Sequence, residues 1–503
     1  MVPGLRFLMS ERLTAARSLA SNTAVLTAAQ VIGIATRLVY IVLVARLLGP
    51  ELYALLAYSQ AWYLAFMPLA LLGLGPALVF AIARSPEQAA NIAASSLAIR
   101  LTMTGLAMVA SVALAWVIAP DARAPLLITA LSVALLGRAL TAWAQHLYAA
   151  YAVNHHALRQ ELVARLLELA LAASVLLGGG SLLLLVLTQG GVWWLQAARS
   201  LYIVRRELVP LRLNWQWADW RPLLALALPL FITTAAVDWR INGPLILFRN
   251  LNDDAVLFGQ FALAMQALFI ANAIPLSLST AALPVLTRSA QRGDGKDLLF
   301  ASVIQRLAFV AGAAAGLLGL ALGPWLFGTL LGPAFIPAGQ LAGLTLWCLI
   351  PLLAGIGYPA VLVARGALRF QMLASVLGAV ATTVLVVLLV PRFGAEGAIV
   401  GAAAGFALPP LLIYGAALRD GWTDVLTTLL RPLAAVTAAL VVWLLTTATW
   451  ALPNPATGAL PTLLPLTLAM GTLLGTALLL RVVSPAEQAV LLQLWRERRV
   501  PAA

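Results

Sequence analysis

The stretch from Ser21 to Ser59 constrains the fold more than any other part of the chain. About 25 mostly apolar residues run into a turn at Gly49-Pro50, and a second apolar run follows. A helix rises about 1.5 Å per residue and a hydrocarbon layer is about 30 Å thick, so a run of this length spans a membrane. The stretch therefore predicts two transmembrane helices joined by a tight turn.

The composition extends this prediction to the whole chain. Of the 503 residues, 62% are hydrophobic and 10% are charged, and the mean hydropathy is +0.97. These values are typical of a polytopic membrane protein. The formal charge of +13 is spread between the apolar runs and forms no basic domain, so we expect no nucleic-acid partner.

Sequence motifs for cofactors are absent. Cys348 is the single cysteine, so neither a disulfide nor a cysteine-based metal site is expected. The chain contains no HExxH motif, no paired Cys/His cluster and no Walker A motif. We therefore expect no metal, no other cofactor and no ATP hydrolysis.

The apolar runs predict an all-α fold with about 14 transmembrane helices. They lie at 21–47, 52–82, 91–119, 124–152, 159–179, 181–204, 221–249, 256–286, 298–331, 335–363, 368–391, 395–418, 430–451 and 462–482. With a cytoplasmic N-terminus, the outer loops keep only Arg46, Arg123, Arg249 and Arg392. Positive charge favours the cytoplasmic side, so both termini are predicted to be cytoplasmic.

An internal repeat relates the two halves of the chain. Arg37 and Arg46 are nine residues apart, and Arg240 and Arg249 repeat this spacing 203 residues later. Arg37 lies about 13 Å from the helix end at Arg46, which is near the centre of the hydrocarbon layer. The repeat predicts two six-helix halves around a central cavity, followed by two extra helices.

The predicted domains follow from this repeat. The first six-helix lobe is 1–204, the cytoplasmic linker is 205–220 and the second lobe is 221–418. Helices 13 and 14 occupy 419–483, and 484–503 is predicted to form an amphipathic cytoplasmic tail.

In the second lobe, Gly397, Gly401 and Gly405 fall four residues apart, a spacing that lets a neighbouring backbone approach closely.

Arg37 and Arg240 are the main candidates for a substrate site. A guanidinium group stays protonated and binds phosphate oxygens in a bidentate manner, so two of them in one cavity suit a diphosphate. Gln30, Asp238 and Asn242 are added as candidate neighbours in this site. The alternative is that a neighbouring helix neutralises each arginine. Asp238 is a candidate for this role, although two residues of separation put it on another face from Arg240.

A second repeated pair lies nearer the predicted cytoplasmic side. Ser96 and Arg100 correspond to Ser302 and Arg306. Arg100 and Arg306 are placed to receive an anionic head group from the inner leaflet. The alternative is that their side chains simply extend to the membrane interface.

Helices 4 and 5 carry further polar side chains. Arg138 and His146 are predicted to line the cavity of the first half. Glu161, Arg165 and Glu168 are spaced so that they neutralise one another on one helix, and proton transfer by Glu168 is the alternative.

Two quoted segments resemble a known family. The N-terminal signature of the polysaccharide transporter family, the Wzx-type O-antigen flippases, is similar to two segments of this chain, ARLLGPELYALLAYSQ and LALLGLGPALVFAIAR. These belong to the multidrug/oligosaccharidyl-lipid/polysaccharide exporter (MOP) superfamily. The resemblance is strongest over residues 21–90, and the repeat at 222–292 looks similar but weaker.

The resemblance implies a flippase for an undecaprenyl-diphosphate-linked oligosaccharide in the bacterial inner membrane, with Arg37 and Arg240 contacting the diphosphate. It also implies a glycan polymerase and a chain-length regulator as possible partners, besides the lipid bilayer. Two other functions stay open. A membrane-embedded glycan polymerase or ligase would use Asp253 and Asp254 on an outer turn, and a cation-coupled drug antiporter would depend on Asp238.

Overall fold

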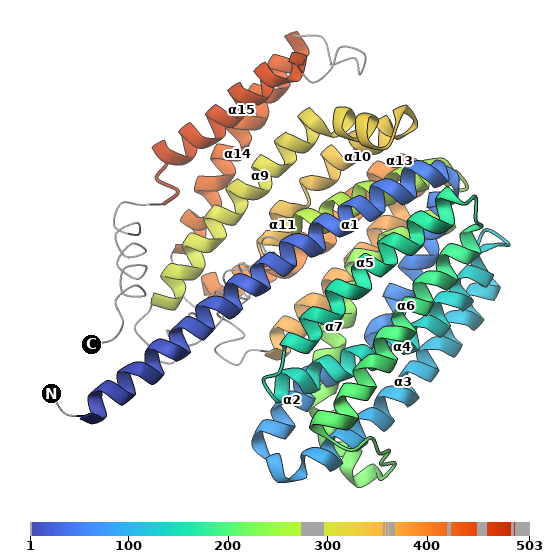
Figure 1. The fold of residues 1–503 in the computed structure, drawn as a ribbon. Coiled ribbons are helices and arrows are strands. Elements are labelled where there is room, and N and C mark those ends of the chain that lie inside the picture. Colours follow the sequence, from blue (N-terminus) through green and yellow to red (C-terminus); the bar gives the residue numbers. More distant parts are fainter. Residues whose placement is uncertain are drawn as a thin grey trace. The chain divides into compact units, whose positions relative to one another are not determined.

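The computed structural model describes residues 3–272, 296–355, 358, 361, 368–419, 424–449, 460–483 and 487, with side chains described from Gly33 onward. These residues form helices joined by short turns, and they contain no strand (Figure 1). The all-α fold is therefore confirmed.

Ten described segments are long and apolar enough to cross a membrane. Two of them each contain a pair of helices that meet at a kinked glycine. α1 (Pro3–Leu71) bends at Gly49, with φ 72°, and α13 (Leu368–Arg419) bends at Gly394, with φ 56°. Only glycine adopts a left-handed φ of this kind without strain, so both helical pairs depend on that residue.

Two further helices are of membrane-spanning length but are less apolar. α5 is His155–Leu177 and α6 is Leu182–Ile203. When these two are added and each kinked segment is counted as two helices, the described part of the chain contains the 14 predicted helices. The protein is thus a polytopic membrane protein.

The chain divides into two compact units. Unit 1 comprises residues 1–48, 74–109 and 129–227, and unit 2 comprises 49–73, 110–128 and 228–503. This division records which segments pack together. The lobes and linker that the repeat predicts stay a prediction.

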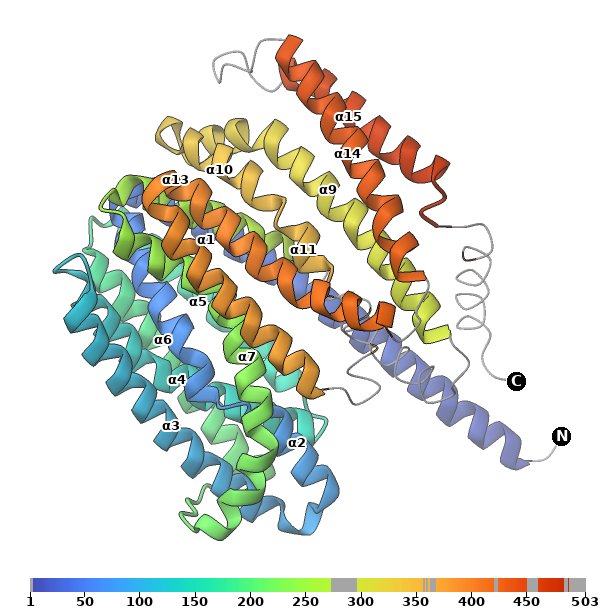
Figure 2. The same cartoon turned by 180° about the vertical axis from the view of Figure 1, so that it is seen from behind.

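Unit 1 is built from helices that lie side by side in both ribbon views (Figures 1 and 2). Besides α5, α6 and the start of α1, it contains α2 (Leu74–Arg84) and parts of α3 (Ala89–Ile118) and α4 (Ala124–Ala150). Gly137 of α4 allows a close approach, because a Cβ there would lie 3.0 Å from the backbone of Trp193 in α6.

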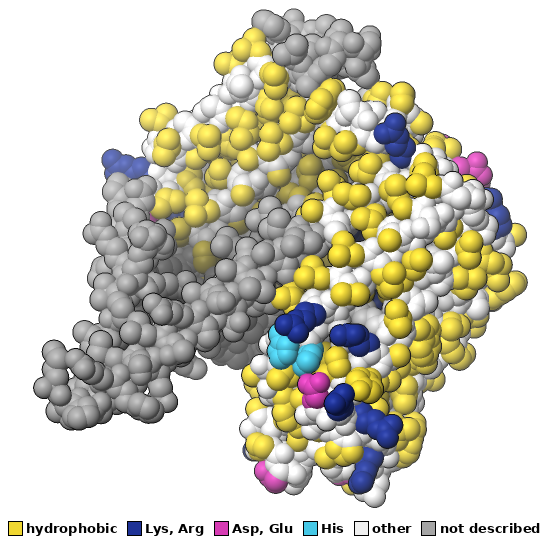
Figure 3. Space-filling model, in the orientation of Figure 1, with side chains coloured by type: hydrophobic (Ala, Val, Ile, Leu, Met, Phe, Trp, Pro, Cys, Tyr) yellow, Lys and Arg dark blue, Asp and Glu magenta, His cyan; other side chains and the backbone are white. Residues whose placement is uncertain are grey.

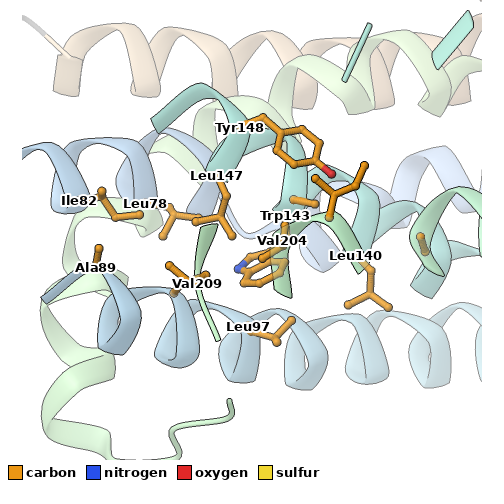
Figure 4. Packing of buried hydrophobic residues seen from close by; sticks show 14 residues of the cluster. Leu78, Ile82, Ala89, Leu97, Leu140, Trp143, Leu147, Tyr148, Val204 and Val209 are labelled. Atoms are coloured by element: carbon orange, nitrogen blue, oxygen red, sulfur yellow. The ribbon is translucent and has the colours of Figure 1, made fainter. Parts of the chain in front are cut away.

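The core of unit 1 surrounds the second half of α4. Trp143, Leu147 and Tyr148 are buried there against Leu78 of α2 and Leu97 of α3 (Figure 4). Lipid chains are as apolar as these side chains, so close van der Waals packing is what stabilises the cluster. This cluster fixes the positions of the polar residues on α3, α4 and α6 described below.

The predicted second helix, 52–82, is not continuous in the structure. The helix is interrupted at Leu72 and Gly73, both of which have positive φ, and it restarts as α2. The amide of Leu72 still donates to the carbonyl oxygen of Pro68 at 2.7 Å. The apolar pattern continues through the break, so hydropathy alone gave no signal of it.

A short non-helical segment leads from the end of α6 to α7. A turn at Val204–Leu208 continues α6, residues 209–216 are non-helical, and α7 begins at Trp217. The Asn214 amide group donates to Asn91 Oδ1 at 2.8 Å and to Asp219 Oδ2 at 2.5 Å. These bonds fasten the linker to the start of α3.

Unit 2 contains the remaining long helices. They are the larger part of α7 (Trp217–Leu251), the segment Ala255–Asn272, α9 (Lys296–Leu330), α10 (Ile336–Leu346), α11 (Leu349–Leu353), α13, α14 (Asp424–Thr449) and α15 (Leu460–Leu479). α9 packs against α10, and α14 packs against both α9 and α15. The predicted helix at 256–286 is described only as far as Asn272, and the predicted tail lies outside the described residues apart from Glu487.

Hydrophobic side chains are spread widely over the described part of the face drawn in Figure 3. Phe80, Val117 and Leu479 have 72%, 80% and 82% of their surface exposed. Large apolar side chains so exposed are suited to contact with lipid chains.

Candidate functional site

The α7 candidate Arg240 is a buried cation in unit 2. Its side chain is only 8% exposed, and Nη1 donates to the backbone carbonyl of Gly405 in α13 at 3.2 Å. Its Nε is buried without a hydrogen-bond partner. In the described part of the chain, this guanidinium group forms no ion pair with Asp238 or any other carboxylate.

The packing of α13 explains why Gly405 can serve as this partner. Gly405 lies where the second half of α13 crosses the first, and a Cβ there would overlap Thr382 Oγ1 and lie 2.9 Å from the carbonyl oxygen of Gly378. Because the residue has no side chain, the two halves approach closely. Thr382 uses its own hydroxyl to bond the carbonyl of Gly378 at 3.1 Å.

The two polar neighbours of Arg240 on α7 are also partly or wholly enclosed. Asp238 is half-buried, and Asn242 is 5% exposed. The Asn242 amide group donates to the carbonyl oxygen of Asp238 at 3.1 Å, whereas its Oδ1 is buried without a partner. One turn of α7 therefore carries a buried cation and an unused buried acceptor.

Arg37 and Gln30 belong to α1. The Arg37 side chain is exposed within unit 1, and the side chain of Gln30 lies outside the described residues. Arg37 is in unit 1 and Arg240 in unit 2, so the meeting of the two guanidinium groups in one cavity stays a prediction.

In unit 1, the Ser-Arg pair of the repeat lies inside the protein. Arg100 is fully buried and Ser96 donates to the carbonyl oxygen of Ala93 at 2.9 Å. The indole N–H of Trp143 donates to Ser96 Oγ at 2.9 Å. Arg100 therefore does not extend to an exposed surface, which was the alternative to a binding role.

In unit 2, the second Ser-Arg pair repeats this local geometry with a different partner. Ser302 donates to the carbonyl oxygen of Leu299 at 2.8 Å, and Arg306 is 4% exposed. Arg306 Nη2 donates to Ser302 Oγ at 3.3 Å and also contacts Glu487 in a buried ion pair. Arg306 is thus also enclosed by protein.

His146 lies on α4 and packs on the backbone of α2. Its Nδ1 donates to the carbonyl oxygen of Ala142 at 2.6 Å, and its ring occupies the space that a Cβ on Gly75 would need. The ring also interacts electrostatically with Arg100. His146 is therefore held between α2 and α4, and its predicted role in lining a cavity stays a prediction.

The charged residues of α4 and α5 form a cluster with α6. Arg165 and Glu161 form the predicted ion pair at 2.9 Å. Glu168 interacts electrostatically with Arg165, and its carboxylate also accepts a 2.5 Å hydrogen bond from the indole N–H of Trp193. The guanidinium carbon of Arg138 lies 5.1 Å from the centre of the same indole ring.

The two α6 members of this cluster, Trp193 and Gln196, were not predicted as functional residues. Gln196 donates to Glu161 at 3.2 Å. A glutamine in an otherwise apolar run is a sequence signal that would have identified it. Trp193 resembles any other core tryptophan in the sequence, and only the structure shows that it joins Arg138 to Glu168.

The turn between α7 and the next helix, predicted to lie on the outer side, is held by side-chain hydrogen bonds. Asp254 Oδ1 accepts a hydrogen bond from the amide of Leu257 at 2.9 Å, and Asn252 Oδ1 accepts one from the amide of Asp254 at 2.8 Å. These are helix-capping contacts of the usual kind. Among the described residues, no three His, Cys, Asp or Glu side chains lie close enough together to hold a metal ion.

Comparisons with known proteins identify a matching family and solved structures with a similar fold. The sequence profile of a family described as polysaccharide biosynthesis protein matches residues 19–290. A search of curated proteins found no match.

The solved structures that are similar to the chain include the following three. An inward-facing multidrug resistance transporter of the MATE family in the MOP superfamily has a TM-score of 0.64 and 16% identity, covering 79% of this chain and 95% of its own. The lipid II flippase MurJ, in an inward closed conformation, has a TM-score of 0.60 and 13% identity, covering 91% and 98%. A MOP superfamily transporter from Pyrococcus furiosus has a TM-score of 0.57 and 14% identity, covering 80% and 95%.

Proposed function

Because the chain belongs to the polysaccharide biosynthesis protein family, we propose that it is a flippase for an undecaprenyl-diphosphate-linked oligosaccharide. The repeat unit of an O-antigen or exopolysaccharide is moved from the inner to the outer leaflet of the bacterial inner membrane. The similar structures include a MATE family transporter and a lipid II flippase, which supports transport over catalysis.

The observation that carries the proposal is the buried Arg240. A guanidinium group in a membrane-spanning helix costs at least a few kcal/mol unless an anion or a polar cavity compensates it. Its partner here is one neutral carbonyl oxygen, and its Nε has none. A diphosphate supplies the missing acceptors, and guanidinium groups bind phosphate oxygens with strong, charge-assisted hydrogen bonds.

The mechanism follows from the cost of moving a charged head group through hydrocarbon. Burying a diphosphate without partners is prohibitive, so the protein must replace its hydration with fixed donors. Arg240 and Arg37 provide permanent positive charge, and Asn242 provides a neutral polar group. The polyprenyl chain stays in the lipid while the two halves of the chain rock and expose the head group to each side in turn.

The fraction of this chain that each similar structure matches also supports a lipid substrate. The likeness to the lipid II flippase covers 91% of the chain, whereas the likeness to the MATE transporter covers 79%. We propose that α14 and α15 border the polyprenyl chain and that both termini are cytoplasmic. The glycan polymerase and chain-length regulator of the same pathway are the proposed protein partners.

One observation favours a second function, cation-coupled export of drugs. In the part of the chain that the structure describes, the half-buried Asp238 forms no ion pair with Arg240, which leaves its carboxyl group to a cation or a proton. In that case Asp238→Asn would abolish transport and Arg240→Ala would have little effect.

The test combines deletion of the gene with extraction of lipid-linked intermediates. We expect complete repeat units to accumulate on the cytoplasmic leaflet, because synthesis continues without transport. Units that reach the outer leaflet and stay unpolymerised would instead indicate a polymerase.

The Arg240→Ala variant, returned to the deletion strain, tests the site. Losing a charged hydrogen-bonding group costs about 1.5–3 kcal/mol, so transport should fall by roughly 10–150-fold. Arg249→Ala is the matched control, because Arg249 lies on the same helix and donates to the carbonyl oxygen of Asn252 in the adjoining turn at 3.0 Å. Wild-type transport by the Arg240 variant would remove Arg240 from the site.

A further inference from the structure

Arg306 of α9 is almost completely enclosed in unit 2. Its side chain is 5% exposed, Nε donates to the carbonyl oxygen of Ser302 at 3.2 Å, and Nη2 donates to Ser302 Oγ at 3.3 Å. Residues before and after it on α9, Ala301 and Phe309, belong to a buried apolar cluster. The positive charge therefore lies where little water can screen it.

The carboxylate that pairs with Arg306 comes from far along the chain. Glu487 is 181 residues later, and its side chain is 12% exposed. Breaking a buried ion pair by removing one partner costs about 3–5 kcal/mol, because the remaining charge is left uncompensated. When Glu487 withdraws, Arg306 consequently needs another anion in the same place.

A lipid phosphate is the anion that fits this requirement. Carboxylate and phosphate oxygens accept the same hydrogen bonds from a guanidinium group. The sequence around Glu487 is amphipathic and predicts a segment on the inner membrane surface, where lipid phosphates are plentiful. Glu487 and a lipid phosphate thus come from the same surface.

We propose that Arg306 is an anion-binding site that Glu487 and a phosphate-bearing lipid head group occupy in turn. Glu487 holds the site closed in the absence of the lipid, and the lipid phosphate displaces it. The inference rests on the proposed function in one respect, namely that the lipid phosphate belongs to the transported lipid. The competition itself needs no transport.

Competition between Glu487 and the lipid for Arg306 can be measured in two ways, as a change in lipid binding and as a change in the Glu487 contact. If Glu487 weakens lipid binding by a given factor, the lipid weakens the Glu487 contact by the same factor. Coupling of this kind commonly amounts to about 5–150-fold. A purely structural ion pair would give no such coupling.

The experiment uses the full-length protein in phosphatidylcholine nanodiscs, with undecaprenyl diphosphate as the probe. We expect Glu487→Gln to bind the probe about 5–150-fold more tightly than the wild type. Glu51→Gln is the matched control, because Glu51 belongs to an exposed pair with Arg123 at 3.6 Å in the same unit. We expect its affinity for the probe to be unchanged.

The wild-type protein gives a second measurement that does not depend on the stability of a variant. Adding undecaprenyl diphosphate should increase hydrogen exchange of the peptide containing Glu487. A parallel arm replaces the probe with phosphatidylglycerol. Release by the diphosphate alone assigns the site to the transported lipid, and release by both assigns it to lipid phosphates in general.

Unchanged affinity of Glu487→Gln together with unchanged exchange in the wild type would overturn the proposal and leave a structural ion pair. Failure of the proposed function is distinguishable from this result. In that case the deletion strain accumulates no repeat units, while the competition between Glu487 and a lipid phosphate is still observed in nanodiscs.

Discussion

Arginine side chains inside the membrane-spanning helices of this chain are stabilised by different groups from one helix to the next. Arg240 bonds a backbone carbonyl, Arg138 lies over the ring of Trp193, and Arg306 pairs with a carboxylate. These partners differ in strength and in how easily a ligand can replace them. A neutral carbonyl leaves the charge of Arg240 uncompensated, whereas a carboxylate must first be displaced from Arg306.

Trp193 has two roles in its cluster, and a conservative substitution separates them. Trp193→Phe keeps an aromatic ring beside Arg138 but removes the N–H that bonds Glu168 at 2.5 Å. Losing a hydrogen bond to a charged group should lower the free energy of unfolding by about 1.5–3 kcal/mol. Thermal unfolding of the purified protein measures the effect.

The adjacent Trp194 is 40% exposed, which makes Trp194→Phe the control. The control should unfold at the wild-type temperature. Equal unfolding temperatures for both variants would show that the bond between Trp193 and Glu168 contributes little to stability.

At the scale of elements, α13 is a hairpin of two helices that glycine residues hold close together. A Cβ on Gly397 would lie 2.6 Å from the carbonyl oxygen of Leu389, and one on Gly401 would lie 2.9 Å from the amide nitrogen of Val386. The four-residue spacing predicted this close approach, and the structure confirms it. The same crossing presents the carbonyl of Gly405 to Arg240, so packing and the candidate site depend on each other.

Adding a single methyl group at this crossing should force the two halves of α13 apart. In Gly401→Ala, the new Cβ would meet Val386 Cγ2 at 2.6 Å and the Val386 backbone just beyond it. Overpacking of this kind costs about 1–3 kcal/mol, which thermal unfolding detects. Gly415→Ala on the same helix is the control, because nothing lies within 4 Å of its new Cβ. If the two variants are equally stable, the crossing is looser than these distances indicate.

At the scale of the whole molecule, the sequence predicts the helices better than it predicts their contacts. Apolar runs and turn residues were enough for the all-α fold and the 14 helices, because length and hydropathy are local properties. The break at Leu72 and Gly73 was missed, since a left-handed turn leaves the apolar pattern unchanged. Contacts such as Trp193 with Glu168 and Arg306 with Glu487 join residues far apart in sequence, and no periodicity identifies such partners.

In the candidate site, too, the sequence identified residues but not the groups that they contact. Arg100 and Arg306 were selected as a repeated pair and Arg240 as the repeat of Arg37, and the structure encloses all three. Their partners come from the tertiary packing, as Gly405 does for Arg240. The pairing of Arg37 with Arg240 rests on the repeat alone and stays a prediction.

The orientation of the whole chain in the membrane gives a further prediction. Arginine and lysine concentrate in the loops assigned to the cytoplasm, so Asn154 should face the cytoplasm and Asp253 the outside. Both side chains are exposed, and the single native cysteine, Cys348, is buried, so cysteines introduced at these two positions are the reactive ones. A thiol reagent that cannot cross the membrane should label Asp253→Cys in intact cells and Asn154→Cys only after the membrane is opened. The unmodified chain, with Cys348 alone, should stay unlabelled in both conditions. Labelling in the reverse order would invert the topology and place Arg306 and Glu487 on the outer side, where the phosphate of a lipid waiting to be transported is not found.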